Sequence, residues 1–234
     1  GQMRSLQALR TAEEYLDVKE LHAEAEAAVV NIAEGTIGPH PEKTRSILQK
    51  VLQQTRNDMI RNRAEQLLSR LRKFESYIKH WLVSGPYTKE GMSCQQLFDV
   101  AFAPEKSEPA EWKKLTAGTD RDRPWLIDLD HAIGGDDRAA YLKTKMWSPE
   151  RKMVLLEVGS NDGIKVWLNG KVVHSNNASR TVTRDEDRAR VRLNKGWNTL
   201  MMKITQSGGT WGACARLVNP DGSTVEGLKV KAEE

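Results

Sequence analysis

The chain has 234 residues, a length that fits one large domain or two modest ones. Hydrophobic residues make up 38% and charged residues 29%, so the composition is polar but is not that of a disordered protein. The 36 basic and 32 acidic residues leave a net charge of +4 without a dense basic stripe, which gives no support to nucleic-acid binding. No apolar run approaches about 20 residues, so the sequence predicts no transmembrane helix.

The first 80 residues have the pattern of helices. Apolar residues recur at spacings of three and four from Leu6 to Ile32, again from Ile47 to Leu52, and again from Met59 to Ile78. Glycines and prolines between residues 35 and 41 separate the first two segments, and Asn57 and Asp58 mark a turn before the third. We therefore predict a helical hairpin or three-helix region over residues 1–80.

From Trp81 onward the segments are short and separated by turn residues. Several alternate between apolar and polar positions, as in Leu200, Met202 and Ile204. Ile78–Val83 fits either the end of the third helix or a first strand. Short strands at roughly even spacing predict an all-β sandwich or jelly roll over residues 81–234. The predicted strands are Ile78–Val83, Gln96–Phe102, Trp125–Asp128, Arg138–Thr144, Lys152–Val158, Ile164–Leu168, Lys171–His174, Arg188–Leu193, Gly196–Thr205, Thr210–Val218 and Lys229–Lys231.

The clearest local signal is a β-hairpin between Ser160 and His174. Ile164–Leu168 alternates in the manner of a strand, and a second apolar segment follows Asn169-Gly170. Asn-Gly supplies the two positive φ angles that a type I′ turn requires. The sequence therefore predicts a two-residue hairpin loop at Asn169 and Gly170.

The order of motifs in the second part resembles a known class of domain. The stretch from Trp81 to Tyr87, followed by Phe102 and Trp112, is similar to the opening of galactose-binding-like jelly-roll modules in secreted bacterial multidomain proteins. The hairpin block from Val154 to Gly170 resembles their central hairpin, and the stretch from Gly196 to Leu217 resembles their closing strands. The preceding helical segment resembles a HEAT-like element more loosely.

This resemblance implies an α+β chain in two parts, a helical region over 1–80 and a galactose-binding-like β-sandwich over 81–234. It also implies a non-catalytic carbohydrate-binding module of a secreted or periplasmic, glycoside-hydrolase-associated protein. The alternative is a structural or protein-interaction module without glycan binding, in which the helical region contacts neighbouring domains or partner proteins. Because one fold hosts many functions, the resemblance does not decide between them.

Tryptophan is the residue type best suited to a sugar, because it offers large, rigid apolar area and one hydrogen-bond donor. Trp147 and Trp211 lie near turns, where binding residues concentrate, and are therefore candidate ligand-binding residues. Core or structural packing is expected instead for the tryptophans inside predicted strands, namely Trp81, Trp125, Trp167 and Trp197.

Polar loop residues supply the other candidates. Asn161 and Asp162 precede Gly163 at the hairpin entrance, and His174 and Arg180 follow the second strand. These four are candidate glycan contacts, with a loop-shaping Asx-turn and a surface histidine as the structural alternatives. Acidic loops at residues 120–123, 134–137 and 185–187 leave open whether a structural calcium ion is bound. For the loop at Asn161 and Asp162, the Asn weakens that interpretation because hard cations prefer charged oxygens.

The chain shows no catalytic or metal-ligand pattern. A phosphate-binding loop, a dinucleotide fingerprint and a nucleophile–histidine–acid set are absent from the sequence, which predicts a protein that is not an enzyme. The histidines lack metal-ligand spacing, so no metal site is assigned. Cys94 and Cys214 lack the spacing of a zinc site or a redox pair, and either a single disulfide or two buried thiols fits them.

Overall fold

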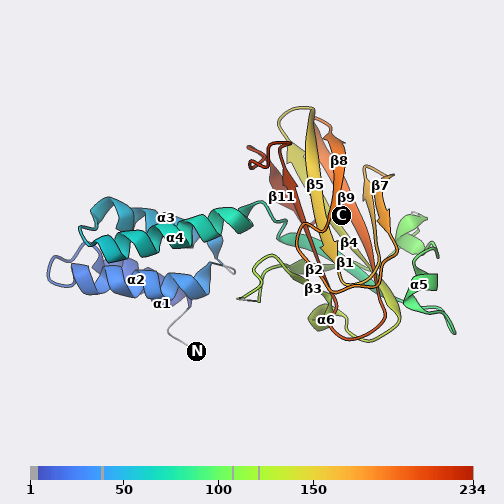
Figure 1. The fold of residues 1–234 in the computed structure, drawn as a ribbon, viewed down its shortest axis with the longest axis horizontal. Coiled ribbons are helices and arrows are strands. Elements are labelled where there is room, and N and C mark those ends of the chain that lie inside the picture. Colours follow the sequence, from blue (N-terminus) through green and yellow to red (C-terminus); the bar gives the residue numbers. More distant parts are fainter. Residues whose placement is uncertain (1–4, 38–39, 107, 121, 234) are drawn as a thin grey trace. The chain divides into compact units, whose positions relative to one another are not determined.

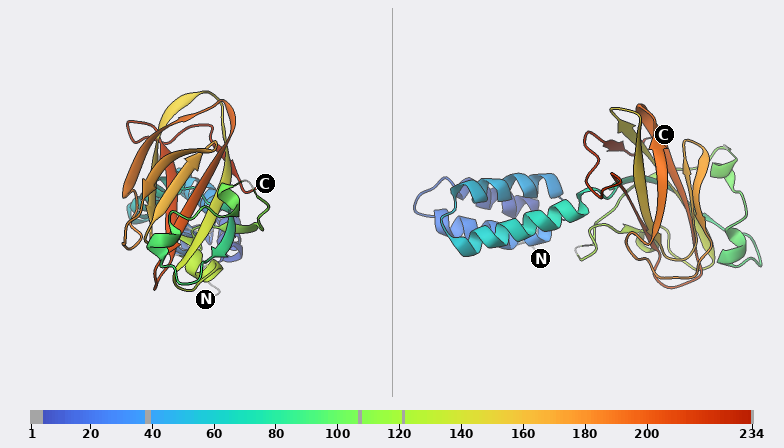
Figure 2. Two further views of the ribbon diagram at one scale, coloured as in Figure 1. Left: turned by 90° about the vertical axis from the view of Figure 1, so that its right-hand side faces the viewer. Right: turned by 45° about the horizontal axis from the view of Figure 1, so that its top comes forward.

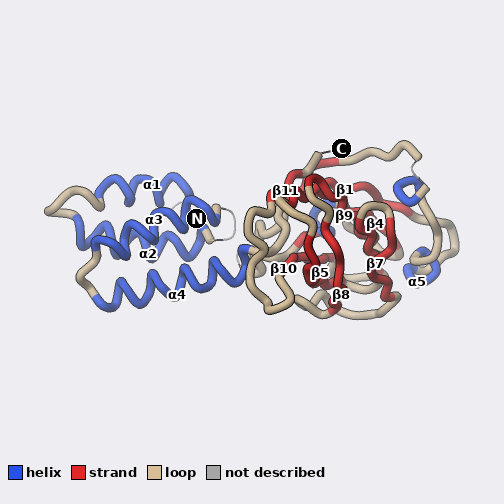
Figure 3. Tube along the Cα trace, turned by 90° about the horizontal axis from the view of Figure 1, so that it is seen from above, coloured by secondary structure: helices blue, strands red, loops and turns tan. Residues whose placement is uncertain are grey.

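The computed structural model of the chain describes residues 5–37, 40–106, 108–120 and 122–233. The chain forms two compact units, residues 1–75 with 118–124, and residues 76–117 with 125–234. Figure 3 shows that the first unit is built from helices and the second mainly from strands. The prediction of an α+β chain, helical at its start and β-structured after it, is therefore confirmed.

Among its described residues the helical unit has four helices where the sequence predicted a hairpin or three. They are α1 (Leu6–Tyr15), α2 (His22–Thr36), α3 (Pro41–Gln54) and α4 (Asp58–Glu75). The first predicted segment divides because Val18 donates to Tyr15 and Leu21 donates to Val18, two short-range bonds that replace the helical pattern. Of the predicted break at residues 35–41, positions 38 and 39 lie outside the described residues.

Local capping fixes where these helices begin. The amide of Ala8 donates to Ser5 Oγ at 3.2 Å, and Pro41 occupies the first turn of α3, where a missing N–H costs nothing. The amide of Met59 donates to Asn57 Oδ1 at 2.9 Å ahead of α4. The helices share one apolar core, which includes Leu9, Val29, Ile47, Leu48, Val51 and Leu71.

The second unit contains two antiparallel sheets (Figures 1 and 2). The larger sheet has the order β2 (Lys113–Thr116), β1 (His80–Tyr87), β4 (Arg138–Ser148), β9 (Gly196–Gln206), β6 (Ile164–Leu168), β7 (Lys171–Asn176), and β11 (Lys229–Lys231) pairs with the end of β4. The smaller sheet has the order β3 (Ile127–Asp128), β10 (Gly212–Val218), β5 (Lys152–Ser160), β8 (Asp187–Leu193). The question left open at Ile78–Val83 is answered by β1, which is a strand.

One core lies between the two sheets. Alternate residues of each strand point into it, as period-two patterning requires. The larger sheet contributes Leu142, Met146, Ile164, Val166, Leu200, Met202 and Ile204, and the smaller contributes Val154, Leu156, Val158, Ala213, Ala215 and Leu217. The residues between these core positions on each strand of the larger sheet therefore point to its outer face.

The predicted hairpin is confirmed. Asn169 has φ 51° and Gly170 has φ 78°, the two positive angles of the expected turn, and β6 has the predicted bounds. Asn169 also fixes the hairpin to β9, because its side chain accepts from the Thr199 amide at 2.9 Å.

One strand prediction was wrong, and one strand was not predicted. Residues 96–102 form no strand, because Ser93 and Gln96 make a reciprocal capping box that starts the short helix α5 (Cys94–Leu97). A 3₁₀ turn, η2 (Ala103–Glu105), follows. Conversely, β2 was missed because Lys113–Thr116 has only one apolar residue and shows no alternation.

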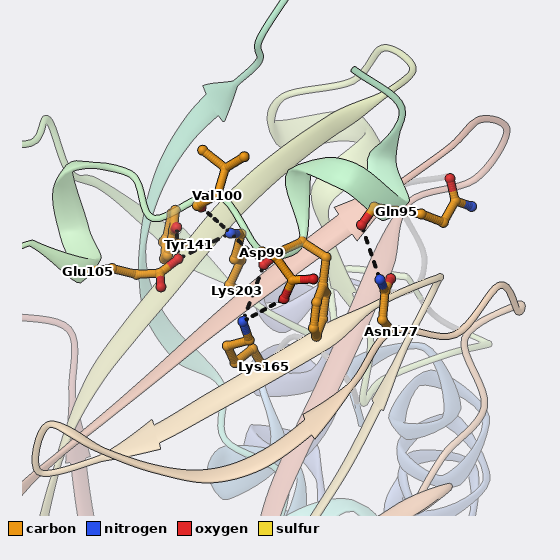
Figure 4. Close-up of polar contacts among 9 residues, drawn as sticks. Gln95, Asp99, Val100, Glu105, Tyr141, Lys165, Asn177 and Lys203 are labelled. Carbon is orange, nitrogen blue, oxygen red and sulfur yellow. Dashed lines mark hydrogen bonds and ion pairs between the residues drawn. The ribbon is translucent and has the colours of Figure 1, made fainter.

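Residues 94–106, which we call the covering segment, lie against the outer face of the larger sheet (green beside β7 in Figure 1). Figure 4 shows the contact that fixes them. The ammonium of Lys203, on β9, is fully buried and donates to the carbonyls of Phe98 at 2.9 Å and Val100 at 2.6 Å and to Glu105 Oε1 at 3.1 Å. Tyr141 donates to the same carboxylate.

Candidate functional site

The hairpin-entrance residues are interior rather than exposed. Asn161 is 6% and Asp162 4% exposed. Asp162 accepts at one oxygen from the Arg180 amide at 2.9 Å and at the other from the Ser207 amide and hydroxyl, both at 2.7 Å. Its φ of 57° turns the backbone sharply at this point. Asp162 therefore joins two distant loops, a role larger than that of a local Asx-turn.

His174 and Arg180 belong to the same polar network. Arg180 donates to Asp187 and to Ser160 Oγ, the latter at 3.0 Å, and His174 Nε2 lies 3.2 Å from the Asp187 carboxylate. Burial alone would raise the pKa of Asp187, but the hydrogen bond and charge of Arg180 outweigh burial and hold it below its ordinary value. The structure thus brings together three of the sequence candidates, Asp162, His174 and Arg180, as an internal network. The neighbouring Asn161 is buried as well, and its side-chain oxygen takes no part in these bonds.

The two tryptophan candidates have different surroundings. Trp211 is 1% exposed and is part of the sandwich core. Trp147 is half-buried and points outward at the end of β4, since Met146 and Ser148 on either side of it are buried. Of the two, only Trp147 lies on an accessible surface.

Trp147 has an aromatic partner that the sequence analysis placed in the core. Trp197, on β9, is directly opposite Trp147 in the strand register and is 48% exposed. Residues opposite one another on paired strands project to the same face, so the two indoles form a cross-strand pair. The alternation of β9 could have revealed this, because Leu200, Met202 and Ile204 point inward and place Trp197 on the other face.

Lysines surround this pair. Lys229 Nζ lies 5.2 Å from the ring centroid of Trp147, and Lys231 Nζ lies 4.3 Å from that of Trp197. Lys145 lies two residues before Trp147 on β4 and so projects to the same face. It is directly opposite Lys231 on β11. We call these five residues, Trp147, Trp197, Lys145, Lys229 and Lys231, the tryptophan–lysine face.

The tryptophan–lysine face is the open half of an outer sheet surface whose other half is covered. Tyr141 and Lys203, on the same strands β4 and β9, are fully buried beneath the covering segment. Six residues after Tyr141, Trp147 lies beyond that cover. The two indole rings can stack on the apolar face of a ligand ring, and the three neighbouring ammonium groups can donate hydrogen bonds at the edge of that ring.

A hollow of about 500 Å³ in this unit lies beside the end of the covering segment, at Ala103. Its lining includes Ser84, Tyr87, Glu111 and Lys113. The hydroxyls of Ser84 and Tyr87 lie 2.7 Å apart and bond to each other, so they are engaged within the fold. Compared with this hollow, the tryptophan–lysine face therefore directs more aromatic and polar groups outward.

Other site types find little support in the part of the chain that the structure describes. Within it, His, Cys, Asp and Glu side chains form no group of three that could hold a metal ion. Its helices also include none long and apolar enough to cross a membrane. Cys94 and Cys214 are free and buried, and burial raises the pKa of the Cys94 thiol to about 11 and that of Cys214 to about 12.

Comparison with known proteins places the chain in no family. No family model matches the sequence, and no curated protein matches it. Among solved structures, the PA14 domain of the antifreeze protein MpAFP is 17% identical with a TM-score of 0.34, over 42% of this chain and 53% of that one. The match thus spans about half of that chain's length.

Two sugar-binding structures match over more of their length. A PA14 sugar-binding domain from an RTX adhesin is 14% identical with a TM-score of 0.40, over 62% of this chain and 93% of that one. The epithelial adhesin 9 A domain from Candida glabrata is 8% identical with a TM-score of 0.41, over 68% and 92%. Because the identities and TM-scores are low, we assign the fold from the strands and the register described above and not from these matches.

Proposed function

We propose that this chain is a non-catalytic carbohydrate-binding module and that the tryptophan–lysine face is its binding surface. The observation that carries the proposal is the cross-strand pair of Trp147 and Trp197, with Trp197 48% exposed. A large aromatic side chain is costly to leave in water, and exposed apolar surface of this kind marks interaction sites. The secreted or periplasmic setting stays a prediction from the sequence resemblance.

The binding mode follows from the geometry of the pair. A pyranose has an apolar C–H face and a rim of hydroxyls. The indoles supply flat apolar area on a rigid sheet at low cost in side-chain entropy, and the neighbouring ammonium groups donate to rim oxygens. Because β4 and β9 are paired along their whole lengths, the two rings are held in place before a ligand arrives.

A glycan array with the intact protein tests this proposal, with Trp197→Ala as the variant. Tryptophan at the centre of a binding surface commonly contributes about 2 kcal/mol or more, so we expect the affinity for any bound glycan to fall at least about tenfold. The matched control is Met153→Ala, which removes a side chain that is 44% exposed on the smaller sheet and should leave binding unchanged.

Three outcomes of these measurements would count against the proposal. Binding that survives both Trp197→Ala and Trp147→Ala would place the glycan elsewhere on the molecule. Absence of binding to every glycan would favour the alternative, a structural or protein-interaction module. Its candidate surface is a groove on the helical unit lined by Ala8, Ala12, Tyr15, Ala28 and Ile32. Turnover of any glycan by the purified chain would contradict the non-catalytic assignment.

A further inference from the structure

The lysines of the tryptophan–lysine face are arranged in a way that needs an explanation. Lys145 and Lys231 are directly opposite on the paired strands β4 and β11. Like charges directly opposite one another on paired strands destabilise a sheet. Lys229 adds a third ammonium on the same short strand. An anion between the opposing lysines would turn this repulsion into attraction.

The chain itself shows which kind of anion fits. The carboxylate of Glu233, two residues beyond β11, forms an ion pair and hydrogen bond with Lys231. Lys231, and at longer range the charges of Lys145 and Lys114, hold the pKa of that carboxyl below its ordinary value. A side chain that is 57% exposed thus places its carboxylate among three lysines from three strands.

The carboxylate position adjoins the aromatic pair. Lys231 Nζ lies 4.3 Å from the Trp197 ring centroid and also contacts Glu233, so one ammonium serves both the ring and the anion. A sugar stacked on Trp197 would therefore carry any ring carboxylate toward the place where Glu233 now lies. Two more lysines lie near the tryptophans, Lys229 over Trp147 and Lys143 at 4.1 Å from the Trp112 ring centroid.

We propose that the tryptophan–lysine face takes a polyuronate, a glycan with a carboxylate on its sugar rings, and that Lys114, Lys145 and Lys231 form its carboxylate subsite. In the free protein Glu233 fills this subsite and competes with the ligand. The inference rests on the proposed function and adds the class of glycan and an internal competitor. Charge complementarity decides the class, because lysines from three strands, Lys114, Lys145 and Lys231, already converge on the carboxylate of Glu233.

The test compares polygalacturonate with its fully methyl-esterified form, which keeps the sugar backbone and removes the charge. We expect the intact protein to bind the acid at least tenfold more tightly than the ester at 0.1 M NaCl. That difference should shrink at 1 M NaCl, because the screening length falls from about 10 Å to about 3 Å.

Three variants separate the subsite from general charge attraction. Lys231→Gln should weaken binding of the acid about tenfold and change binding of the ester less than twofold. Glu233→Gln should strengthen binding of the acid several-fold, because it removes the competitor. Lys171→Gln is the matched control, an exposed lysine on β7 away from the face, and should change neither.

The outcomes distinguish the two proposals. Equal binding of acid and ester, lost in Trp197→Ala, would overturn the polyuronate inference and keep the glycan-binding function. Failure of Glu233→Gln to strengthen binding of the acid would overturn the role of competitor. Tighter binding of single-stranded oligothymidylate than of polygalacturonate would overturn the ligand class, since nucleobases also stack on indoles. Polymer binding that is unchanged in both Trp147→Ala and Trp197→Ala would contradict the proposed function itself.

Discussion

Asp162 shows how one buried side chain can fix a loop region. Its carboxylate accepts three hydrogen bonds from Arg180 and Ser207, residues 18 and 45 positions away in the chain. Hydrogen bonds to a charged acceptor contribute more than neutral ones, about 1.5–3 kcal/mol each. This geometry makes Asp162 a positioning residue for the loops after β7 and β9.

Asp162→Asn tests that role while keeping the backbone, because Asn tolerates the positive φ found here. The amide replaces one acceptor with a donor that faces other donors, so we expect the free energy of unfolding to fall by about 2–3 kcal/mol. Urea unfolding measures it as a lower midpoint with an unchanged slope. Asp99→Asn is the control, since that carboxylate is 79% exposed and should shift stability by less than about 0.5 kcal/mol.

At the residue scale the sequence predicted some roles and left others undecided for physical reasons. Asn169 and Gly170 were predictable because a two-residue turn depends on local φ angles alone. The exposure of Trp197 could also be read from strand parity. The burial of Asp162 could not, because it depends on Ser207, a residue 45 positions away that the pattern around Asp162 does not reveal.

At the element scale, the covering segment divides the outer face of the larger sheet into a closed and an open half. Its attachment depends on Lys203, whose ammonium is removed from water and shared among two carbonyls and Glu105. Burial lowers the pKa of Lys203, and the charge of Glu105 offsets part of that effect. A buried pair of this kind stabilises only while both partners are present.

Lys203→Met should therefore release the covering segment. Because the substitution leaves the Glu105 carboxylate without its buried ammonium, we expect a loss of about 3–5 kcal/mol in stability. Hydrogen exchange should show faster amide exchange across residues 94–106, together with newly exposed Tyr141. Lys165→Met is the control, because Lys165 contacts Phe98 and Asp99 at the rim at 3.3 and 3.4 Å and its loss should cost about 1 kcal/mol or less. Equal effects of the two variants would contradict the role given to Lys203.

The same segment explains an error of sequence interpretation. Residues 96–102 contain enough apolar positions to suggest a strand, yet Ser93 and Gln96 start a helix and the chain then runs irregularly over the sheet. Its place is decided by contacts with Lys203 and Tyr141, about 100 and 40 residues away, which local periodicity does not encode. Strands with strong alternation, such as β6, were by contrast predicted with their bounds.

At the scale of the whole molecule, seven tryptophans are sorted by what covers them. Trp81, Trp125, Trp167 and Trp211 are buried, Trp112 and Trp147 are half-buried, and Trp197 is exposed. Two antiparallel sheets bury one face of each strand, and the covering segment buries part of another. On the outer face of the larger sheet, the tryptophan–lysine face lies beyond the covering segment. Its residues belong to strands, so the expectation that binding residues lie in loops did not point to them.

The central claim is that this face, and no other aromatic group, receives the glycan. The most direct measurement is a titration of the indole Nε1–H signals by heteronuclear NMR, with the strongest ligand from the array. Signals of Trp147 and Trp197 should move together and saturably, while the signal of Trp81, whose Nε1 donates to the Ile78 carbonyl at 2.9 Å, should stay fixed. Saturable shifts confined to tryptophans outside the face, with Trp147 and Trp197 unchanged, would contradict the account.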